Sequence, residues 1–261
     1  MAVVTSTGAA GVSVTGTVSV VGSSTIAPVL GELGRLFEAG HPGTRINVET
    51  GGSTRGIVEA RSGRADIGMV SRALTVNEQD LAAYLVARDG VALILHSGLE
   101  VQSLKREQVI DIYTGRIDRW VGVGGPDAPI SVIHKAEGRS TLEVFLDHFG
   151  LKPTDVRPSV VVGDNQQCIK SVASIPGAIG YVSIGAAEFA VADGVGIRLL
   201  PLDGICATTA NVRAKRYALT RELNLVTDAT VSPVTRAFID FVLSSDATET
   251  IRDLYFVPIG D

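Results

Sequence analysis

The sequence lacks the features that mark membrane-spanning and nucleic-acid-binding proteins. No apolar run approaches the ~18 residues that a bilayer-spanning helix needs. Lys and Arg form no cluster, and these 23 basic residues are outnumbered by 28 acidic ones, which gives a net charge of −5. A basic patch is the usual footprint of a nucleic-acid binder, so we expect no nucleic-acid partner. With 45% hydrophobic and 20% charged residues, the 261-residue chain can instead bury a substantial core.

Cysteine and histidine are scarce. The two cysteines, Cys168 and Cys206, fit either one disulfide of an exported protein or two unpaired, buried thiols, and the sequence leaves both possibilities open. The four histidines, at positions 41, 96, 134 and 148, show no spacing typical of a metal site. We therefore expect neither a metal nor a cofactor.

The first 16 residues carry no charged side chain and consist largely of Ala, Gly, Val, Ser and Thr. They lack the basic start, the long apolar core and the cleavage site of a complete secretory signal. We interpret residues 1–16 as a flexible N-terminal segment from which an export signal is missing.

Three short loops share a composition rich in Gly and in hydroxyl side chains. They are residues 22–25 (Gly-Ser-Ser-Thr), 51–56 (Gly-Gly-Ser-Thr-Arg-Gly) and 138–141 (Gly-Arg-Ser-Thr), and each precedes an apolar pattern at helical spacing. The first N–H groups of a helix have no intrahelical acceptor and lie at the positive end of the helix dipole. Glycine lets the backbone approach a ligand closely, and Ser and Thr add hydroxyl donors. Three such loops predict that the fold gathers helix N-termini around one small oxyanion.

Strand and helix patterns alternate along the chain. The predicted strands are residues 17–21, 45–50, 65–70, 91–95, 130–133, 160–162, 179–183 and 216–219. The predicted helices lie near residues 26–37, 57–61, 75–87, 104–113, 142–149, 169–173, 234–243 and 248–255. The third of these helices rests on the capping-box pattern of Thr75 and Glu78. The order strand, donor-rich loop, helix is typical of a parallel α/β sheet, where ligands lie at the carboxyl ends of the strands.

Six motifs, in order along the chain, resemble those of one family. They are residues 22–28, 51–57, 65–72, 112–115 together with Trp120, 124–130, and 176–182. In this order and over nearly the whole chain after residue 16, they resemble the phosphate-binding, periplasmic-type substrate-binding proteins of ABC importers.

The resemblance implies a two-lobed α/β receptor of the type II periplasmic-binding-protein fold. Each lobe would hold a mostly parallel sheet flanked by helices, and a two-segment hinge would join the lobes. Residues 17–95 plus 217–261 would form the first lobe and residues 96–216 the second. Phosphate would bind in the cleft between them.

The resemblance also implies a set of phosphate-binding residues, which the two lobes would share. The first lobe would contribute Ser23, Ser24, Thr25, Ser53, Thr54, Ser71 and Arg72, and the second would contribute Arg139, Ser140, Thr141, Asp164 and Asn165. Asp164 and Asn165 also fit a plain helix-capping pattern. Lys135, shortly before the third loop, fits either an anion-steering or a solvated side chain.

Two positions depart from the family pattern. The third loop reads Gly-Arg-Ser-Thr where the family commonly has Gly-Ser-Gly-Thr, so Arg139 is a candidate replacement for a family arginine. Some members carry an Asp at the position of Ser71 or Arg72, which accepts the proton of phosphate. Here the acceptor must lie elsewhere, and Asp164, Glu137 and Glu49 are the candidate carboxylates, beside a Ser hydroxyl or a backbone carbonyl.

Two alternative functions remain open at this point. The missing Asp leaves room for a receptor of another oxyanion, such as sulfate, molybdate or tungstate. A hydrolase is the second alternative, because residues 51–55 resemble a nucleophile elbow; however, Arg55 stands where that motif needs Gly, and the sequence has neither His-Glu-x-x-His nor a complete P-loop. We expect no enzymatic activity.

The resemblance further implies the protein's partners and location. We expect a monomer that binds inorganic phosphate and serves the membrane permease of an ABC transporter. Its expected location is periplasmic or otherwise extracytoplasmic, with lipid anchoring left open.

Overall fold

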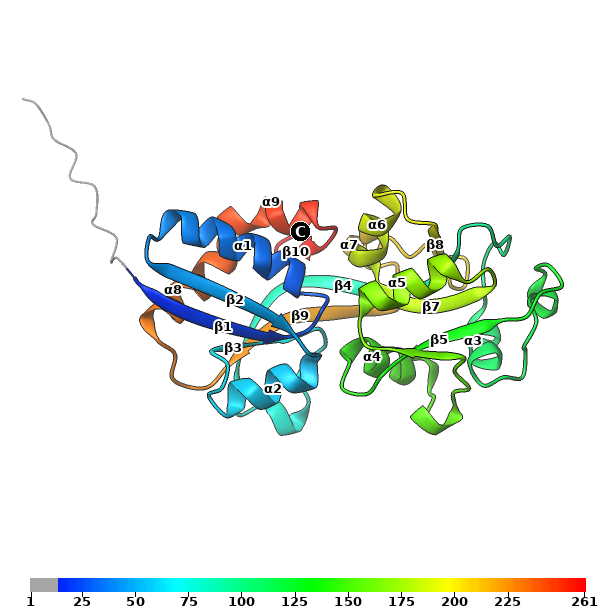
Figure 1. The fold of residues 1–261 in the computed structure, drawn as a ribbon, viewed down its shortest axis with the longest axis horizontal. Coiled ribbons are helices and arrows are strands. Elements are labelled where there is room, and N and C mark those ends of the chain that lie inside the picture. The colour runs from blue at the N-terminus through cyan, green and yellow to red at the C-terminus, as the bar shows by residue number, and fades with distance from the viewer. Residues whose placement is uncertain (1–13) are drawn as a thin grey trace, which may run out of the picture.

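The computed structural model describes residues 14–261, and the predicted segment 1–16 falls mostly outside that range. Gly16 already belongs to the first strand. The described chain forms two halves that lie side by side, each with helices packed around part of one continuous sheet (Figure 1). Among residues 14–261, no helix combines the length and apolar character needed to cross a membrane.

The first half is built from both ends of the chain. Its elements are β1 (Gly16–Gly22), α1 (Ala27–Gly40), β2 (Thr44–Thr50), α2 (Ser53–Arg61), β3 (Ile67–Val70), α8 (Pro233–Val242), α9 (Thr248–Asp253) and β10 (Val257–Pro258). Pro28 occupies the first turn of α1, where its missing N–H breaks no helical bond, and the apolar stripe of that helix is buried.

The middle of the chain forms the second half. Its elements are α3 (Arg106–Tyr113), β5 (Ser131–Lys135), α4 (Ser140–Phe149), β6 (Val160–Val162), α5 (Asn165–Ser174), β7 (Ala178–Ser183), α6 (Ile184–Ala192), β8 (Ile197–Leu200) and α7 (Thr209–Arg213). Short 3-10 turns cover Val76–Glu78, Trp120–Val123, Pro153–Asp155 and Ser245–Ala247. Gly150 ends α4 in the left-handed conformation, with φ of 65°, as its place after the apolar stripe predicts.

Two strands connect the halves. β4 (Ala82–His96) and β9 (Thr220–Thr227) run antiparallel to each other from Ala82 opposite Thr227 to Gly90 opposite Thr220. The early part of β4 pairs with β9 and β10, and its later part pairs with β7 and β8. The strand order is β2-β1-β3-β9-β4-β7-β5-β6, so β4 is shared by both halves.

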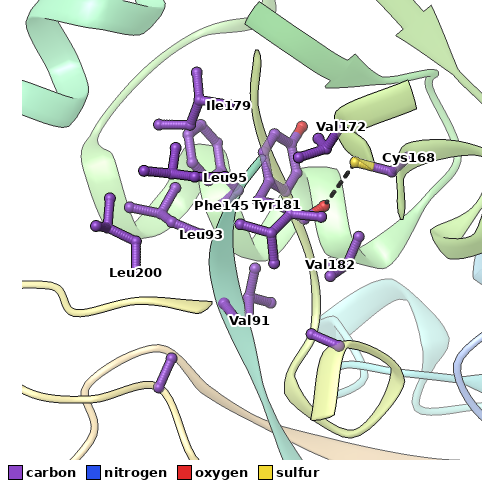
Figure 2. Close-up of a cluster of buried hydrophobic side chains, with 14 of the residues drawn as sticks. Val91, Leu93, Leu95, Phe145, Cys168, Val172, Ile179, Tyr181, Val182 and Leu200 are labelled. Atoms are coloured by element: carbon purple, nitrogen blue, oxygen red, sulfur yellow. Dashed lines mark hydrogen bonds between the residues drawn. The ribbon is translucent and has the colours of Figure 1, made fainter. Parts of the chain in front are cut away.

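Two large hydrophobic cores lie on either side of the middle of β4. The first core draws its buried residues from positions 18–87 and 223–256, and the second from positions 91–219 plus Val257. In the second core Phe145 stacks on Tyr181 with a ring-centroid distance of 4.0 Å, against the apolar run of β4 (Figure 2). The lobe boundaries expected at residues 95/96 and 216/217 stay predictions, but the division of the cores falls close to them.

The predicted α/β architecture is confirmed, with mixed rather than mostly parallel pairing. β1–β2, β1–β3, β5–β6 and β5–β7 are parallel, whereas every pair that includes β4 or β9 is antiparallel. The two connecting strands therefore introduce the antiparallel character, because each crosses between the halves and returns beside the other.

The predicted helix over residues 75–87 is wrong. The capping box of Thr75 and Glu78 does form, but it starts only a short 3-10 turn. From Ala82 onward the chain is extended and paired with β9, so tertiary pairing outweighs the local helix signal. The predicted strand over residues 216–219 also lies too early, since β9 begins at Thr220.

The sequence analysis missed α6, β8 and α7. Apart from Glu188, α6 consists of apolar residues and Gly185, which leaves no separate apolar stripe at helical spacing to detect. The cysteines are both free: Cys168 is buried in the second core and Cys206 is exposed, so the disulfide alternative does not occur in the described chain.

Two helical glycines provide a matched test of this packing. A Cβ added at Gly56, in α2, would lie 2.8 Å from the Val21 carbonyl oxygen, whereas one added at Gly31, in α1, would meet nothing within 4 Å. We expect Gly56→Ala to lower the free energy of unfolding by about 1–3 kcal/mol through overpacking. Gly31→Ala should raise it by about 0.5–1 kcal/mol because alanine loses less backbone entropy on folding. Urea unfolding of both variants measures this, and a Gly56→Ala protein as stable as the parent would contradict the packing of α2 on β1.

Candidate functional site

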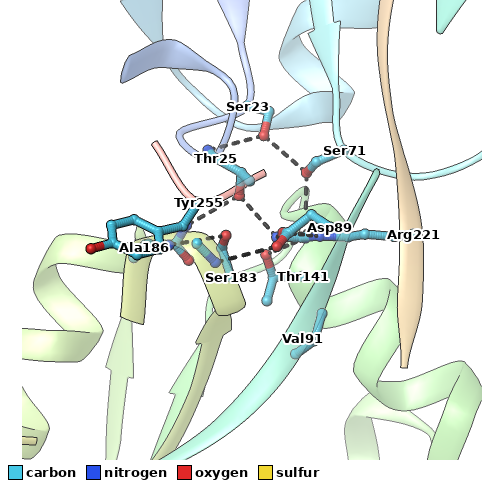
Figure 3. Close-up of polar contacts among 12 residues, drawn as sticks. Ser23, Thr25, Ser71, Asp89, Val91, Thr141, Ser183, Ala186, Arg221 and Tyr255 are labelled. Carbon is cyan, nitrogen blue, oxygen red and sulfur yellow. Dashed lines mark hydrogen bonds and ion pairs between the residues drawn. The ribbon is translucent and has the colours of Figure 1, made fainter. Parts of the chain in front are cut away.

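A buried arginine from the connecting strand β9 lies at the centre of the polar cluster between the halves (Figure 3). Arg221 donates from Nε and Nη2 to Oδ2 of Asp89, at 2.9 and 2.8 Å, and both side chains are 1% exposed. Asp89 lies directly opposite Arg221 in the β4–β9 ladder. The guanidinium also donates to Thr25 Oγ1 at 3.0 Å, to Thr141 Oγ1 at 2.9 Å and to Ser71 Oγ at 3.5 Å. The loops before α1 and α4 and the end of β3 thus meet at one cation.

The hydroxyl-rich loops contact one another around this cation. Asn165 Nδ2 donates to Thr25 Oγ1 at 3.1 Å, which joins the start of α5 to the loop before α1. Ser23 Oγ donates to Ser71 Oγ at 2.9 Å, and Ser53 Oγ accepts from the Ser71 N–H at 3.2 Å. All five residues are buried, so the structure gathers the predicted hydroxyls of Ser23, Thr25 and Ser53 beside Ser71.

A buried lysine adds a second positive charge. Lys135, the last residue of β5, is 3% exposed and donates from Nζ to the Asp164 carbonyl oxygen and to Asn165 Oδ1, the latter at 3.4 Å. No carboxylate lies within ion-pair distance of it in residues 14–261. Burial lowers the pKa of the Lys135 ammonium to about 8, with Arg221 and Arg139 adding to the decrease.

The buried charges of this region do not cancel. The buried charged side chains of the described chain are Asp89, Lys135 and Arg221, two positive and one negative, since burial lowers the pKa of His134 to about 4 and leaves that ring neutral near pH 7. An unmatched buried charge is costly without a counter-charge. The cluster therefore favours one bound anion.

The start of α4 supplies donors to the same place. Ser140 is buried, and its Oγ has no hydrogen-bond partner among the described residues. Buried hydroxyls nearly always have a partner, so an orphan one at a helix N-terminus is a mark of a ligand position. The first N–H groups of α4 point the same way as the positive end of its dipole. Hydroxyl, helix end and buried cations together form a site suited to a small oxyanion.

Arg72 forms ion pairs with two carboxylates. Its Nη1 donates to Glu78 at 2.7 Å and its Nε to Glu143, with the arginine side chain 12% exposed. Arg72 follows β3 and Glu143 belongs to α4, so this ion pair links the two halves at the rim of the polar cluster. The arginine at the centre is Arg221 instead, and a direct role for Arg72 in anion binding stays a prediction without support from its contacts.

The remaining predicted residues are more peripheral. Thr54 is exposed, and its N–H donates to the Gly138 carbonyl oxygen at 3.4 Å, a backbone contact between the second and third loops. Ser24 lines a cleft between α1, α5, α6 and the segment that follows α9. Arg139 precedes α4 and extends past Gly52 toward Gly163.

None of the three proposed proton acceptors is aimed into the buried cluster. Asp164 is partly exposed and caps α5 by accepting from the Gln167 N–H at 2.8 Å. Glu137 is exposed, and Glu49 is exposed and paired with Arg55 at 2.7 Å. The buried carboxylate of the cluster is Asp89, which the sequence analysis did not consider.

Two functional candidates, Asp89 and Arg221, were missed because each looks ordinary alone. Both occupy strand positions beside apolar residues, and a charged residue at a buried strand position needs an opposite charge. That signal was present in the sequence, but the pairing of positions 132 residues apart was not. For Lys135 the solvated interpretation is wrong, since the side chain is buried.

The Arg72–Glu78 pair predicts how stability depends on pH. Hydrogen bonds from Arg72 lower the pKa of Glu78 from 4.5 to about 2. A carboxylate with a depressed folded-state pKa stabilises the protein above pH 4.5, and this contribution is lost as the pH falls from 4.5 toward 2. We expect Glu78→Gln to lose on the order of 2–3 kcal/mol at pH 7 and to show a shallower loss of stability in acid.

Urea unfolding at pH 7, 4 and 3 tests this expectation, with Glu107→Gln as the control. Glu107 is exposed and has no ion pair among residues 14–261, so its replacement should change little. Parallel pH profiles for Glu78→Gln and the parent protein would contradict the coupling of Glu78 to Arg72.

Comparison with known proteins identifies the family of the chain. The PBP superfamily domain matches residues 7–246. A structure from Clostridium perfringens, assigned as a phosphate ABC transporter substrate-binding protein with bound phosphate, is 30% identical, with a TM-score of 0.88 over 94% of this chain and 100% of that one. An ABC-type phosphate transport receptor from Vibrio cholerae is 29% identical, with a TM-score of 0.75 over 93% of this chain and 100% of that one.

Curated sequences give the same result. The phosphate-binding protein PstS of Bacillus subtilis (strain 168) is 23% identical over 251 residues, which cover 94% of this chain and 82% of the relative. The predicted periplasmic-binding-protein fold and the family resemblance are thereby confirmed. The chain belongs to the PBP superfamily and is a relative of the substrate-binding proteins of phosphate ABC transporters.

Proposed function

We propose that this protein binds inorganic phosphate between two lobes and delivers it to the membrane permease of an ABC-type importer. The lobes are the two halves around the first and second cores, and β4 and β9 are the hinge segments. The observation that carries the proposal is the buried positive charge of Lys135, left unmatched because Asp89 pairs with Arg221, together with the orphan hydroxyl of Ser140. The names of the related receptors support phosphate as the anion.

The proposed binding set combines donors from both lobes. The first lobe supplies the hydroxyls of Thr25, Ser53 and Ser71, and the second supplies Ser140, Thr141 and the ammonium of Lys135. Hydrogen bonds to a charged acceptor are shorter and stronger than those between neutral groups, so a few such bonds can hold a buried anion. Because the contacts come from both lobes, ligand binding favours the closed arrangement.

The proposal extends to location and assembly. The receptor acts outside the cytoplasmic membrane as a monomer and has no catalytic step of its own. Absence of p-nitrophenyl phosphate hydrolysis by the purified protein would support the last statement, and turnover at the site would overturn it.

Another oxyanion is the second candidate, because the carboxylate that some relatives use to recognise the proton of phosphate has no counterpart at Ser71 or Arg72. Sulfate, molybdate and tungstate belong in the same titration as phosphate. If one of them binds more tightly than phosphate, the proposed anion site stands but its ligand is that anion.

Phosphate should raise the melting temperature of the protein. A ligand specific to the folded state adds about 2.7 kcal/mol at a hundredfold excess over its dissociation constant. For a chain of this size that corresponds to a shift of roughly 5–10 °C. Thermal denaturation of protein stripped by unfolding and refolding measures the shift, with chloride as the control; equal melting temperatures in both salts would count against phosphate binding.

The affinity for phosphate should fall above pH 8, because the Lys135 ammonium has a pKa of about 8 before the anion binds. An anion favours the charged lysine, so binding takes up a proton above this pH and the affinity drops by up to about tenfold per pH unit. The groups that face Lys135 are the Asp164 carboxylate, the Arg139 and Arg221 guanidinium groups and the Cys168 thiol, whose pKa burial raises. The fall in affinity is assigned to Lys135, whose pKa lies in this range.

Isothermal titration at pH 7, 8 and 9 tests this prediction. Lys135→Met should weaken binding by roughly 10- to 100-fold at pH 7, the value of a charge-assisted hydrogen bond, and should flatten the decline above pH 8. Lys170→Met, which removes an exposed lysine of α5, is the matched control. A decline that persists in Lys135→Met would assign it to another group.

A further inference from the structure

We propose that Arg221 is a positioning residue that fixes the hydroxyls of Thr25, Ser71 and Thr141 as hydrogen-bond donors toward the bound oxyanion. The inference rests on the proposed function, since it concerns the same anion site. It assigns Arg221 a role through those hydroxyls and no direct contact with the anion.

The N–H donors of Arg221 are fully used within the protein. A guanidinium has five N–H groups and no acceptor. Arg221 makes five hydrogen bonds: two to Asp89 and one each to Thr25, Ser71 and Thr141. An arginine that bound the anion directly would need an N–H group left over, and this one has none.

The hydroxyl oxygens of Thr25, Ser71 and Thr141 all accept hydrogen bonds from Arg221. A hydroxyl has one O–H donor and two acceptor lone pairs. Thr25 Oγ1 accepts from both Arg221 and Asn165, so its lone pairs are occupied and its hydrogen must point elsewhere. Ser71 Oγ likewise accepts from both Arg221 and Ser23. Thr141 Oγ1 accepts from Arg221, which turns its hydrogen away from the guanidinium.

Arg221 and Asp89 are held rigidly in place. Asp89 Oδ2 accepts from both Nε and Nη2 of Arg221, and the pair lies in register across β4 and β9. Asp89 Oδ1 also accepts from the Gly185 N–H at 3.4 Å, which ties the carboxylate to the start of α6. Because the guanidinium of Arg221 is already fixed, it loses little conformational entropy when the hydroxyls bind to it.

The consequence is a donor set that forms only when the lobes meet. Thr25 and Ser71 belong to the first lobe and Thr141 to the second, so Arg221 orients all three together only in the closed arrangement (Figure 3). Hydroxyls fixed as donors match an oxygen that only accepts. They treat the unprotonated oxygens of phosphate and sulfate alike, so discrimination between these anions must come from another group.

A double-mutant cycle on the full chain tests the proposal. Phosphate affinity is measured by calorimetry for Thr141→Val, Arg221→Lys and the double variant. Each single change should weaken binding about tenfold, the value of one or two charge-assisted donors. The double variant should be at most about threefold weaker than the worse single variant, because Arg221 acts through Thr141 and its partners. Losses that multiply would show that Arg221 binds the anion independently, and would overturn the proposal.

Two controls separate positioning from general stability. Thr227→Val removes a buried hydroxyl of β9 that does not contact Arg221 in the described structure, and Arg198→Lys alters an arginine that donates only to the Leu99 and Val101 carbonyl oxygens. Both should keep the parent affinity, whatever their effect on the melting temperature of the stripped protein. Equal losses of affinity in these controls would also overturn the proposal.

Asp89→Asn adds a test in which the direction of the change in phosphate affinity decides. It keeps Arg221 in place and so remains informative if Arg221→Lys fails to fold. It raises the charge of the site by one. If Arg221 acted only through its charge, phosphate would bind more tightly; if the fixed guanidinium positions the hydroxyls, binding should weaken about tenfold or more. Tighter binding overturns the proposal.

The parent protein is titrated first with phosphate and then with sulfate. Binding of sulfate but not phosphate would overturn the proposed function alone, and the same cycle is then measured with sulfate. A parent protein that binds neither anion overturns both.

Discussion

The ion pair between Asp89 and Arg221 is the contact on which the rest of the site depends. It joins the two strands that cross between the cores, and its side chains are almost fully buried. A buried ion pair gains little over an apolar pair because both charges lose their hydration, unless further hydrogen bonds satisfy them. Here three hydroxyls and a backbone N–H supply those bonds, and the three hydroxyls belong to the proposed anion site. The pair is therefore better explained by what it organises than by the stability it adds.

The charge of the site is local and opposite to that of the whole chain. The protein carries a net charge of −5, whereas its buried charged side chains sum to one positive charge. Long-range attraction of an anion by the protein as a whole is therefore weak, and recognition depends on short contacts in a dry environment, where each donor counts for more. Lys135 fits this requirement because no carboxylate of residues 14–261 lies within ion-pair distance of it, and Ser140 at the start of α4 fits because its Oγ has no partner among those residues.

Local sequence signals predicted the parts of the site that are themselves local. The Gly- and hydroxyl-rich loops 22–25 and 138–141 do converge, since each ends a strand and begins a helix. Arg72 illustrates the limit of local signals. Its place after β3 matched the family motif, but the ion pairs of its guanidinium could not be predicted. Glu78 lies in a turn that was predicted as a helix, and Glu143 lies in the other half of the molecule. Arg221 required knowledge of strand pairing over more than a hundred residues, which no local pattern contains.

The same limit applied to the fold. Alternating strands and helices identified the α/β class, and Gly150 and the apolar stripe of α4 fixed one helix closely. The helix prediction after Thr75 was wrong. The capping box forms, but it begins only a 3-10 turn, and the chain then becomes extended and pairs with β9. Mixed pairing was likewise invisible in sequence, because the direction of a strand depends on which partner it finds.

The position of β9 between β3 and β4 has a consequence for how the chain is made. Residues 220–227 fill a gap in the first half's sheet, although its other strands up to β4 are complete by residue 96. A chain still being synthesised therefore carries two unpaired strand edges, on β3 and β4, while the whole second half emerges. Such edges readily join other chains, so a nascent or truncated form needs protection until β9 is made. The late position of β9 in the chain thus makes it the strand that closes the gap between β3 and β4.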